Sequence, residues 1–173
     1  KLSQPEYFTE NIAMSGTSPH DSLQPRMSSL VILNHVKGGL ELAAQYKLKK
    51  VIREAISGHH GTSLVYYFYR RALDKTAAEG DDSVIGQEDY RYPGPLPIRK
   101  EIVLIGIADA CEAAARSLEK PTPQKIKAVV EDIVMKRVED GQFDQADLTF
   151  RDLAVAKASI VKTLSTMLHA RIA

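Results

Sequence analysis

The sequence lacks several features that would each point to a particular class of protein. It contains one cysteine, Cys111, in 173 residues, so an internal disulfide is excluded and a reducing compartment is expected. Lys and Arg number 23 against 22 Asp and Glu, a formal net charge of +1, which argues against a broad basic surface for DNA or RNA. No apolar run reaches the roughly 18 residues that a membrane-spanning helix needs.

Targeting signals and repeats are also missing. The opening segment KLSQPEYFTEN has none of the features of a signal peptide. We therefore expect a soluble fragment, and the absence of an initial methionine suggests a piece of a longer protein. The sequence shows no internal repeat and no low-complexity tract. Its length suits one domain with a sizeable core, predicted here over residues 1–173.

The apolar residues recur at helical spacing, and no sustained alternation predicts strands. Pro25 near a first turn, Thr122 with Pro123, and Gly141 supply start and stop signals. The predicted helices cover residues 22–39, 38–48, 49–57, 62–80, 98–119, 122–141 and 149–173, and a loop rich in Gly, Pro and Asp covers 80–97. The helix over 98–119 is strongly apolar, so we expect it at the centre of an all-α fold.

Two adjacent histidines, His59 and His60, lie between Gly58 and Gly61 at the predicted start of the helix over 62–80. Neighbouring residues inside a helix point about 100° apart, but flanking glycines would let both rings turn toward one cavity. Neutral imidazole is the commonest metal ligand. The alternative is an exposed pair at a helix end with no ligand, and the local spacing leaves both open.

Asp109 lies in the segment IGIADACEAAARSL, among apolar and small neighbours. A buried carboxylate costs several kcal/mol unless it is paired or bound to a cation. The position predicts either a salt bridge to a buried Arg or Lys, or a metal ligand inside a helical bundle. A ligand set of Asp109 with His35, His59 and His60 suits Mn or Fe better than a structural zinc ion. Glu112, one turn on, is either an outer residue of that site or a surface charge.

The remaining histidines have simpler interpretations. His35 is a core or capping residue if it is not a ligand. His20 and Asp21 look like a metal dyad, but they precede a predicted helix, so Asp21 or Ser22 is expected to cap it. His169, near the end of the chain, is expected to face solvent or the helix dipole.

Four segments carry a resemblance to a known family: NHVKGGLELAAQYKL, ISGHHGTSLVYYFY, EDYRYPGPLPIRKEIVLIGIADACEAAARSL and PTPQKIKAVVEDIVMKRVEDGQFDQADLTFRDL. The chain resembles, over essentially its whole length, the cytoplasmic HD-type hydrolase domain of the bacterial seven-helix transmembrane HD receptors. Members of that family are cyclic-di-AMP phosphodiesterases. The resemblance implies an all-helical HD-domain bundle with two divalent metal ions, usually Mn or Fe. It also implies a membrane-anchored parent protein with this domain at the cytoplasmic face of the bacterial inner membrane.

The resemblance implies roles for individual residues. The implied metal ligands are His35, His59, His60 and Asp109, of which His59, His60 and Asp109 are also the catalytic set. Lys37, Arg91 and Tyr92 are weaker matches for contacts to phosphate or base. The implied partner is a cyclic dinucleotide, hydrolysed to the linear dinucleotide, and not a DNA or RNA polymer; a homodimer is also compatible with the sequence.

The family's name-giving His–Asp dyad and an earlier metal histidine have no match in this sequence. The segment KLSQPEYF resembles the residues that directly follow the dyad, so we expect an N-terminally truncated HD domain. His20 and Asp21 are no substitute, because the family has that turn as well. Two alternatives stay open: a degenerate HD domain that senses a nucleotide or transmits a signal, and an HD phosphohydrolase that acts on another nucleotide.

Overall fold

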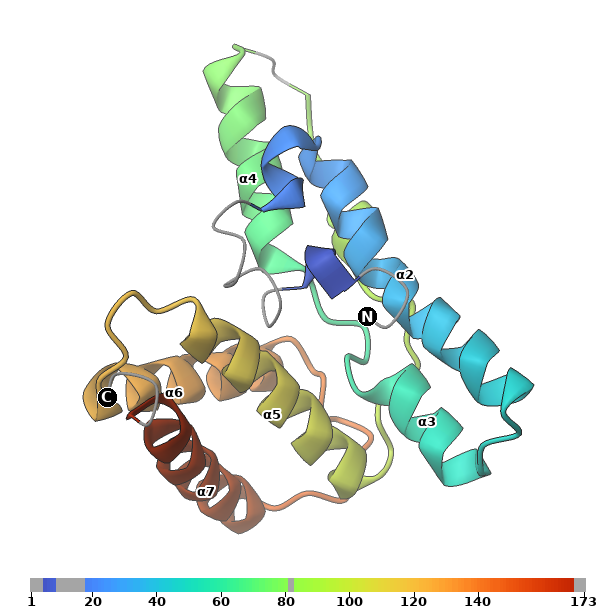
Figure 1. Ribbon diagram of the computed structural model, residues 1–173, viewed down its shortest axis with the longest axis vertical. Coiled ribbons are helices and arrows are strands. Elements are labelled where there is room, and N and C mark those ends of the chain that lie inside the picture. Colours follow the sequence, from blue (N-terminus) through green and yellow to red (C-terminus); the bar gives the residue numbers. More distant parts are fainter. Residues whose placement is uncertain (1–4, 9–17, 81–82, 170–173) are drawn as a thin grey trace. The chain divides into compact units, whose positions relative to one another are not determined.

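The structure, a computed structural model, describes residues 5–8, 18–80 and 83–169. Its helices, drawn in Figure 1, are η1 (Pro5–Tyr7), η2 (Pro19–Ser22), α2 (Pro25–Gln45), α3 (Lys50–Gly58), α4 (Tyr66–Ala78), η3 (Glu88–Tyr90), α5 (Lys100–Arg116), α6 (Pro123–Glu139) and α7 (Phe150–His169). In these ranges β-structure is limited to an isolated bridge between Leu64 and Arg91. The predicted all-α class is confirmed. None of the described helices is both long and apolar enough to span a bilayer.

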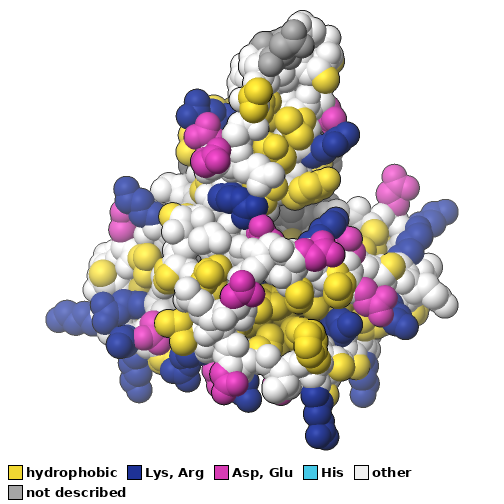
Figure 2. Space-filling view, turned by 180° about the vertical axis from the view of Figure 1, so that it is seen from behind, with side chains coloured by type: hydrophobic (Ala, Val, Ile, Leu, Met, Phe, Trp, Pro, Cys, Tyr) yellow, Lys and Arg dark blue, Asp and Glu magenta, His cyan; other side chains and the backbone are white. Residues whose placement is uncertain are grey.

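The chain forms two compact units. Unit 1 comprises Lys1–Ser57 and Gly61–Pro95, and unit 2 comprises Gly58–His60 and Leu96–Ala173. Charges of both signs are interspersed on the face drawn in Figure 2, as the near-zero net charge predicts. The prediction of one domain over residues 1–173 stays a prediction.

In unit 1, α2 and α4 pack side by side, and η3 packs against both (Figure 1). Phe68 and Ala72 of α4 form the buried centre with Tyr90 of η3. The segment 80–97, predicted as a loop, therefore contributes a side chain to the core of unit 1, because Tyr90 is only 4% exposed. Burial raises the pKa of the Tyr90 hydroxyl, and the neighbouring Asp89 carboxylate adds to the effect.

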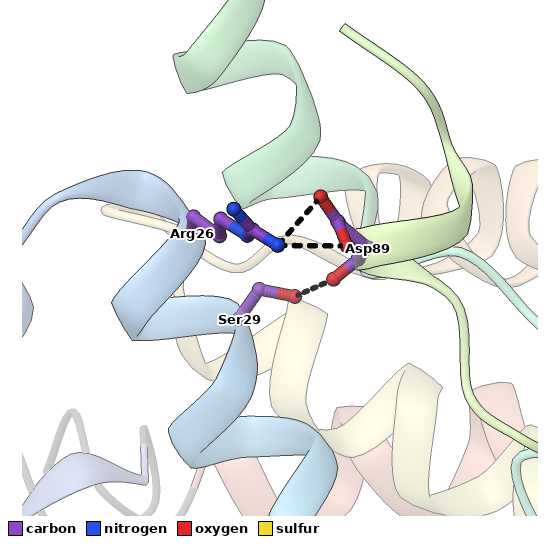
Figure 3. Close-up of polar contacts among 3 residues, drawn as sticks. All are labelled: Arg26, Ser29 and Asp89. Atoms are coloured by element: carbon purple, nitrogen blue, oxygen red, sulfur yellow. Dashed lines mark hydrogen bonds and ion pairs between the residues drawn. The ribbon is translucent and has the colours of Figure 1, made fainter.

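Polar contacts hold η3 on the first turns of α2 (Figure 3). Nη2 of Arg26 lies 3.2 Å from each carboxylate oxygen of Asp89. The hydroxyl of the fully buried Ser29 donates a hydrogen bond to the Asp89 carbonyl at 3.5 Å. The ion pair is largely exposed, so it contributes at most about 1 kcal/mol. Its main effect is to fix the position of the loop that leads to Arg91 and Tyr92.

The prediction of two helices meeting at Gly38–Gly39 is wrong, because α2 runs unbroken from Pro25 to Gln45. A glycine weakens a helix without ending it, and packing outweighs that cost. Gly39 also has a packing role. A Cβ at this position would lie 3.0 Å from Cγ2 of Ile56, so the glycine lets α3 approach α2 closely.

In unit 2, α5, α6 and α7 each pack against the other two (Figure 1), and α5 carries more buried side chains than α6. Its buried side chains Val103, Ile107 and Cys111 meet Val130 and Val134 of α6 in one core cluster, as the apolar pattern predicts. The predicted start signals are also confirmed. Thr122 accepts a hydrogen bond from the Lys125 N–H ahead of α6, and Thr149 and Asp152 exchange capping bonds at the start of α7.

The carboxyl end of α2 is closed by a Schellman motif. The N–H of Leu48 bonds to the Ala43 carbonyl at 2.8 Å, and that of Lys47 bonds to the Ala44 carbonyl at 3.1 Å. Lys47 has a φ of +51°, the left-handed conformation for which glycine is the usual residue. Lys47 therefore carries a backbone cost of about 1 kcal/mol in this turn.

Replacing Lys47 with glycine is expected to raise the free energy of unfolding by about 1 kcal/mol, because the left-handed conformation costs a glycine nothing. The measurement is urea denaturation of both proteins. Glu41→Gly, in the exposed interior of the same helix, is the control and should lose about 1 kcal/mol. A loss of stability in Lys47→Gly would contradict the assignment of strain to this residue.

Candidate metal centre

His59 and His60 follow the carboxyl end of α3. The prediction that they begin a helix is wrong: they lie in a turn, and α4 starts only at Tyr66. The turn continues through Thr62, and the chain then runs alongside the 90–92 segment, because Leu64 pairs with Arg91 and the Val65 N–H bonds to the Tyr90 carbonyl at 2.8 Å. Gly61 gives the backbone the freedom expected of a glycine beside the pair, since its φ of +56° is a conformation that favours glycine.

The two imidazole rings lie next to each other, with centroids 3.9 Å apart and planes inclined by 39°. His60 is buried, with 8% of its surface exposed. Nε2 of His60 lies 3.8 Å from Oδ2 of Asp109. This separation is too long for a direct hydrogen bond, but it is less than twice the roughly 2.1 Å of a metal–nitrogen or metal–oxygen bond. Unit 2 by itself thus places Asp109 beside His60 and His60 beside His59.

Gly106 of α5 brings the central helix up to the histidine turn. A Cβ at this position would overlap the backbone carbonyl oxygen of His59, and it would lie 2.9 Å from Nη1 of Arg137. Only a residue without a side chain allows this approach. Asp109 follows Gly106 by three residues, about one helical turn, so the same contact sets its distance from the histidine pair.

His35 lies in α2, within unit 1. Its Nδ1 hydrogen-bonds to the Ile32 carbonyl at 2.5 Å, a contact that assigns the proton to Nδ1 and the lone pair to Nε2. The ring packs edge-on against Phe8, at 5.6 Å between centroids, and against Tyr92, at 6.0 Å. A bond from the first ring nitrogen to a backbone carbonyl is the usual arrangement of a metal-binding histidine, whose second nitrogen is the ligand.

The predicted substrate contacts, Lys37, Arg91 and Tyr92, all lie in unit 1. Lys37 is exposed on α2. Arg91 donates to the Thr62 carbonyl and to Oε1 of Gln87, each at 2.9 Å. Tyr92 is buried, and its N–H bonds to the Ser63 carbonyl at 3.0 Å. Arg91 and Tyr92 therefore connect the 83–97 segment to the residues that follow the histidine pair, and their contact with a substrate stays a prediction.

Other candidate residues have structural roles. Glu112 forms a salt bridge with Arg116 at 2.5 Å. Asp21 does not cap α2 as predicted: its carboxylate completes a capping box with Ser18 around η2. His20 is buried, and its Nε2 bonds to the Tyr7 carbonyl at 2.9 Å. The side chain of His169 lies outside the described residues.

Cys111, the one cysteine of the sequence, lies two residues after Asp109. It is fully buried, and burial raises its pKa to about 11 while the positive charge of Arg137 acts in the opposite direction. It therefore stays protonated at neutral pH and is a poor metal ligand or nucleophile.

Gly106 and Arg137 were not among the residues predicted from the sequence. Gly106 stands in the apolar segment IVLIGIADAC, where a glycine costs helix stability without ending the helix. That local cost is a signal of close packing by another segment. Arg137 had no comparable signal, because a basic residue in the last turn of a helix is common.

The all-α fold, the apolar helix α5, and a histidine pair whose buried member His60 lies beside an aspartate of that helix are together what we expect of an HD-type domain. No family model matches the chain. It is 40% identical over 172 residues to the cyclic-di-AMP phosphodiesterase PgpH of Bacillus subtilis, a match that covers 99% of this chain. The chain spans 23% of the length of that relative.

Two solved structures of the Listeria monocytogenes PgpH HD domain resemble it closely. The first has a TM-score of 0.85 at 37% identity and covers 98% of this chain and 76% of the other. The second, which holds cyclic-di-AMP, has a TM-score of 0.84 at 36% identity and covers 96% of this chain and 75% of the other. The chain therefore belongs to the PgpH family of HD domains.

Gly106→Ala is expected to lower the free energy of unfolding by about 1–3 kcal/mol, because the added methyl group overlaps the His59 carbonyl. Gly38→Ala is the matched control. A Cβ at Gly38 meets nothing within 4 Å, so this variant should gain up to about 1 kcal/mol.

Urea denaturation measures both effects, and NMR of the imidazole rings reports the position of His59 and His60. Only Gly106→Ala should shift these ring signals. Equal stability of the two alanine variants, with unchanged ring signals, would show that the close approach is not a constraint.

Proposed function

We propose that the chain is the metal-dependent catalytic domain of a cyclic-di-AMP phosphodiesterase. The carrying observation is the group formed by His59, His60 and Asp109 in unit 2, with 3.8 Å between His60 and Asp109. The family relationship supports the reaction, since the relatives named PgpH are cyclic-di-AMP phosphodiesterases. A PgpH HD domain has also been solved with cyclic-di-AMP.

The donor set fits divalent metal ions. Two adjacent imidazoles and a carboxylate are ligands that Mn and Fe accept, and the protonated thiol of Cys111 leaves the set without sulfur. We propose His35 as a further ligand through Nε2, because its Nδ1 is engaged by the Ile32 carbonyl. The proposed occupancy is two ions, Mn or Fe, as the resemblance implies.

Two divalent ions held there would supply a water molecule activated for attack and would neutralise charge on the phosphodiester. The chain's own residues prepare the site for this. The Asp109 carboxylate offsets part of the positive charge, and it does so beside the buried His60, where low exposure strengthens the attraction. Gly106 holds the His59 backbone against α5, so the imidazole pair needs little rearrangement on binding.

The proposed product is the linear dinucleotide from hydrolysis of one phosphodiester bond. We propose Lys37 as a cation for substrate phosphate, because its side chain is exposed two residues beyond His35. Arg91 and Tyr92 would act mainly by position, since their observed contacts hold the 83–97 segment. The parent protein is proposed to be membrane-anchored, with this domain at the cytoplasmic face.

Asp109→Asn is expected to reduce Mn²⁺ affinity by more than about 100-fold, because loss of residues that merely support a ligand already costs 10–100-fold. Mn²⁺ binding is measured by calorimetry, and hydrolysis of cyclic-di-AMP by separating the linear product. Activity should fall with metal affinity, while the helical content is unchanged.

Glu112→Gln is the matched control. It removes a carboxylate of α5 one turn from Asp109, and that carboxylate pairs with Arg116. This variant should keep both metal binding and hydrolysis. Wild-type Mn²⁺ affinity in Asp109→Asn would remove Asp109 from the site.

A further inference from the structure

The turn between α2 and α3 presents a surface that the proposed catalysis does not use. Every residue from 46 to 53, with the sequence YKLKKVIR, is exposed. We call these eight residues the corner segment. Four of them are cationic, and no acidic residue occurs between Glu41 and Glu54. The cations are Lys47, Lys49, Lys50 and Arg53, of which Lys50 pairs with Glu54 at 3.6 Å. In a chain with a net charge of +1, this is a strong local concentration of positive charge.

The other four residues of the corner segment are apolar or aromatic. Tyr46 is 69% exposed, Leu48 37%, Val51 46% and Ile52 43%. Ile52 shares a helix face with Ile56 one turn later, and Ile56 lies against Gly39 of α2. The apolar face of α3 thus begins inside unit 1 and continues outward onto the exposed first turn.

Two features of the corner segment work against the stability of the fold. Lys47 occupies a left-handed position where glycine costs less. Lys49 and Lys50 lie at the amino end of α3, whose first turn contains no acidic residue, although a helix dipole disfavours cations there. Such local conflicts are expected where a function requires the side chains.

We propose that the corner segment docks on an anionic lipid surface. Cations that alternate with exposed apolar side chains match this partner, because the cations attract acidic headgroups while Tyr46, Leu48, Val51 and Ile52 enter the interface. A protein partner fits less well, since lysine is depleted at the centre of protein interfaces. The inference rests on the corner segment alone and is independent of the metal centre.

The test measures sedimentation of the 173-residue chain with vesicles of phosphatidylcholine plus phosphatidylglycerol, and with vesicles of phosphatidylcholine alone. Binding is expected to the mixed vesicles and to weaken as salt is added. Lys47→Gly should weaken it about fivefold, the effect of one cation near the surface. Because this variant is expected to be more stable than the wild type, unfolding cannot account for the loss. Ile52→Ser should weaken binding by a similar factor.

Two control variants lie outside the corner segment. Lys127→Gln removes a cation whose side chain is 67% exposed, and Val84→Ser removes an apolar side chain that is 96% exposed. Both should bind mixed vesicles as the wild type does. Equal binding of all four variants would overturn the proposal, as would equal binding to both kinds of vesicle. Failure to bind either kind would also overturn it and would leave a protein partner for the corner segment.

Discussion

The close approach of α5 to the histidine turn is the constraint on which the candidate metal centre depends. Gly106 leaves room for the His59 carbonyl, and Asp109 lies about one turn further along the same helix. The core behind α5 is closely packed, with Ile107 and Cys111 both fully buried. The helix therefore has little freedom to retreat, and the His60–Asp109 distance is set by packing rather than by the weak attraction between the two side chains.

In unit 1, polar contacts and a buried tyrosine fix the position of a loop. The Arg26–Asp89 and Ser29–Asp89 contacts fix η3 on α2, and Tyr90 enters the core beside Phe68. From this anchored point the chain continues to Arg91, whose guanidinium reaches back to the Thr62 carbonyl. The residues after the histidine pair are thereby tied to a loop far away in sequence. His35 is oriented in the same unit by its bond to the Ile32 carbonyl.

Much of this was predictable from the sequence, where local signals and packing agree. The caps at Thr122 and Thr149 and the apolar helix α5 follow from residue type and spacing. The Asp109 carboxylate on that helix is less buried than its apolar neighbours suggest, with 29% of its side chain exposed. The errors occur where tertiary contacts override local preference. Gly38 and Gly39 do not end α2, because one of them accommodates Ile56. The histidines end α3 instead of starting α4, because Leu64 pairs with Arg91, a contact between distant residues that no local pattern records.

The candidate site was predictable as a set of residue types but not as a geometry. The histidine pair and Asp109 attract notice in the sequence, whereas the glycine that brings them together does not. A crystal structure with Mn²⁺ located by anomalous diffraction would show whether these side chains bind metal jointly. We expect Mn²⁺ within bonding distance of both an imidazole nitrogen of the pair and an Asp109 oxygen. Mn²⁺ bound elsewhere, with Asp109 still directed at a metal-free His60, would contradict it.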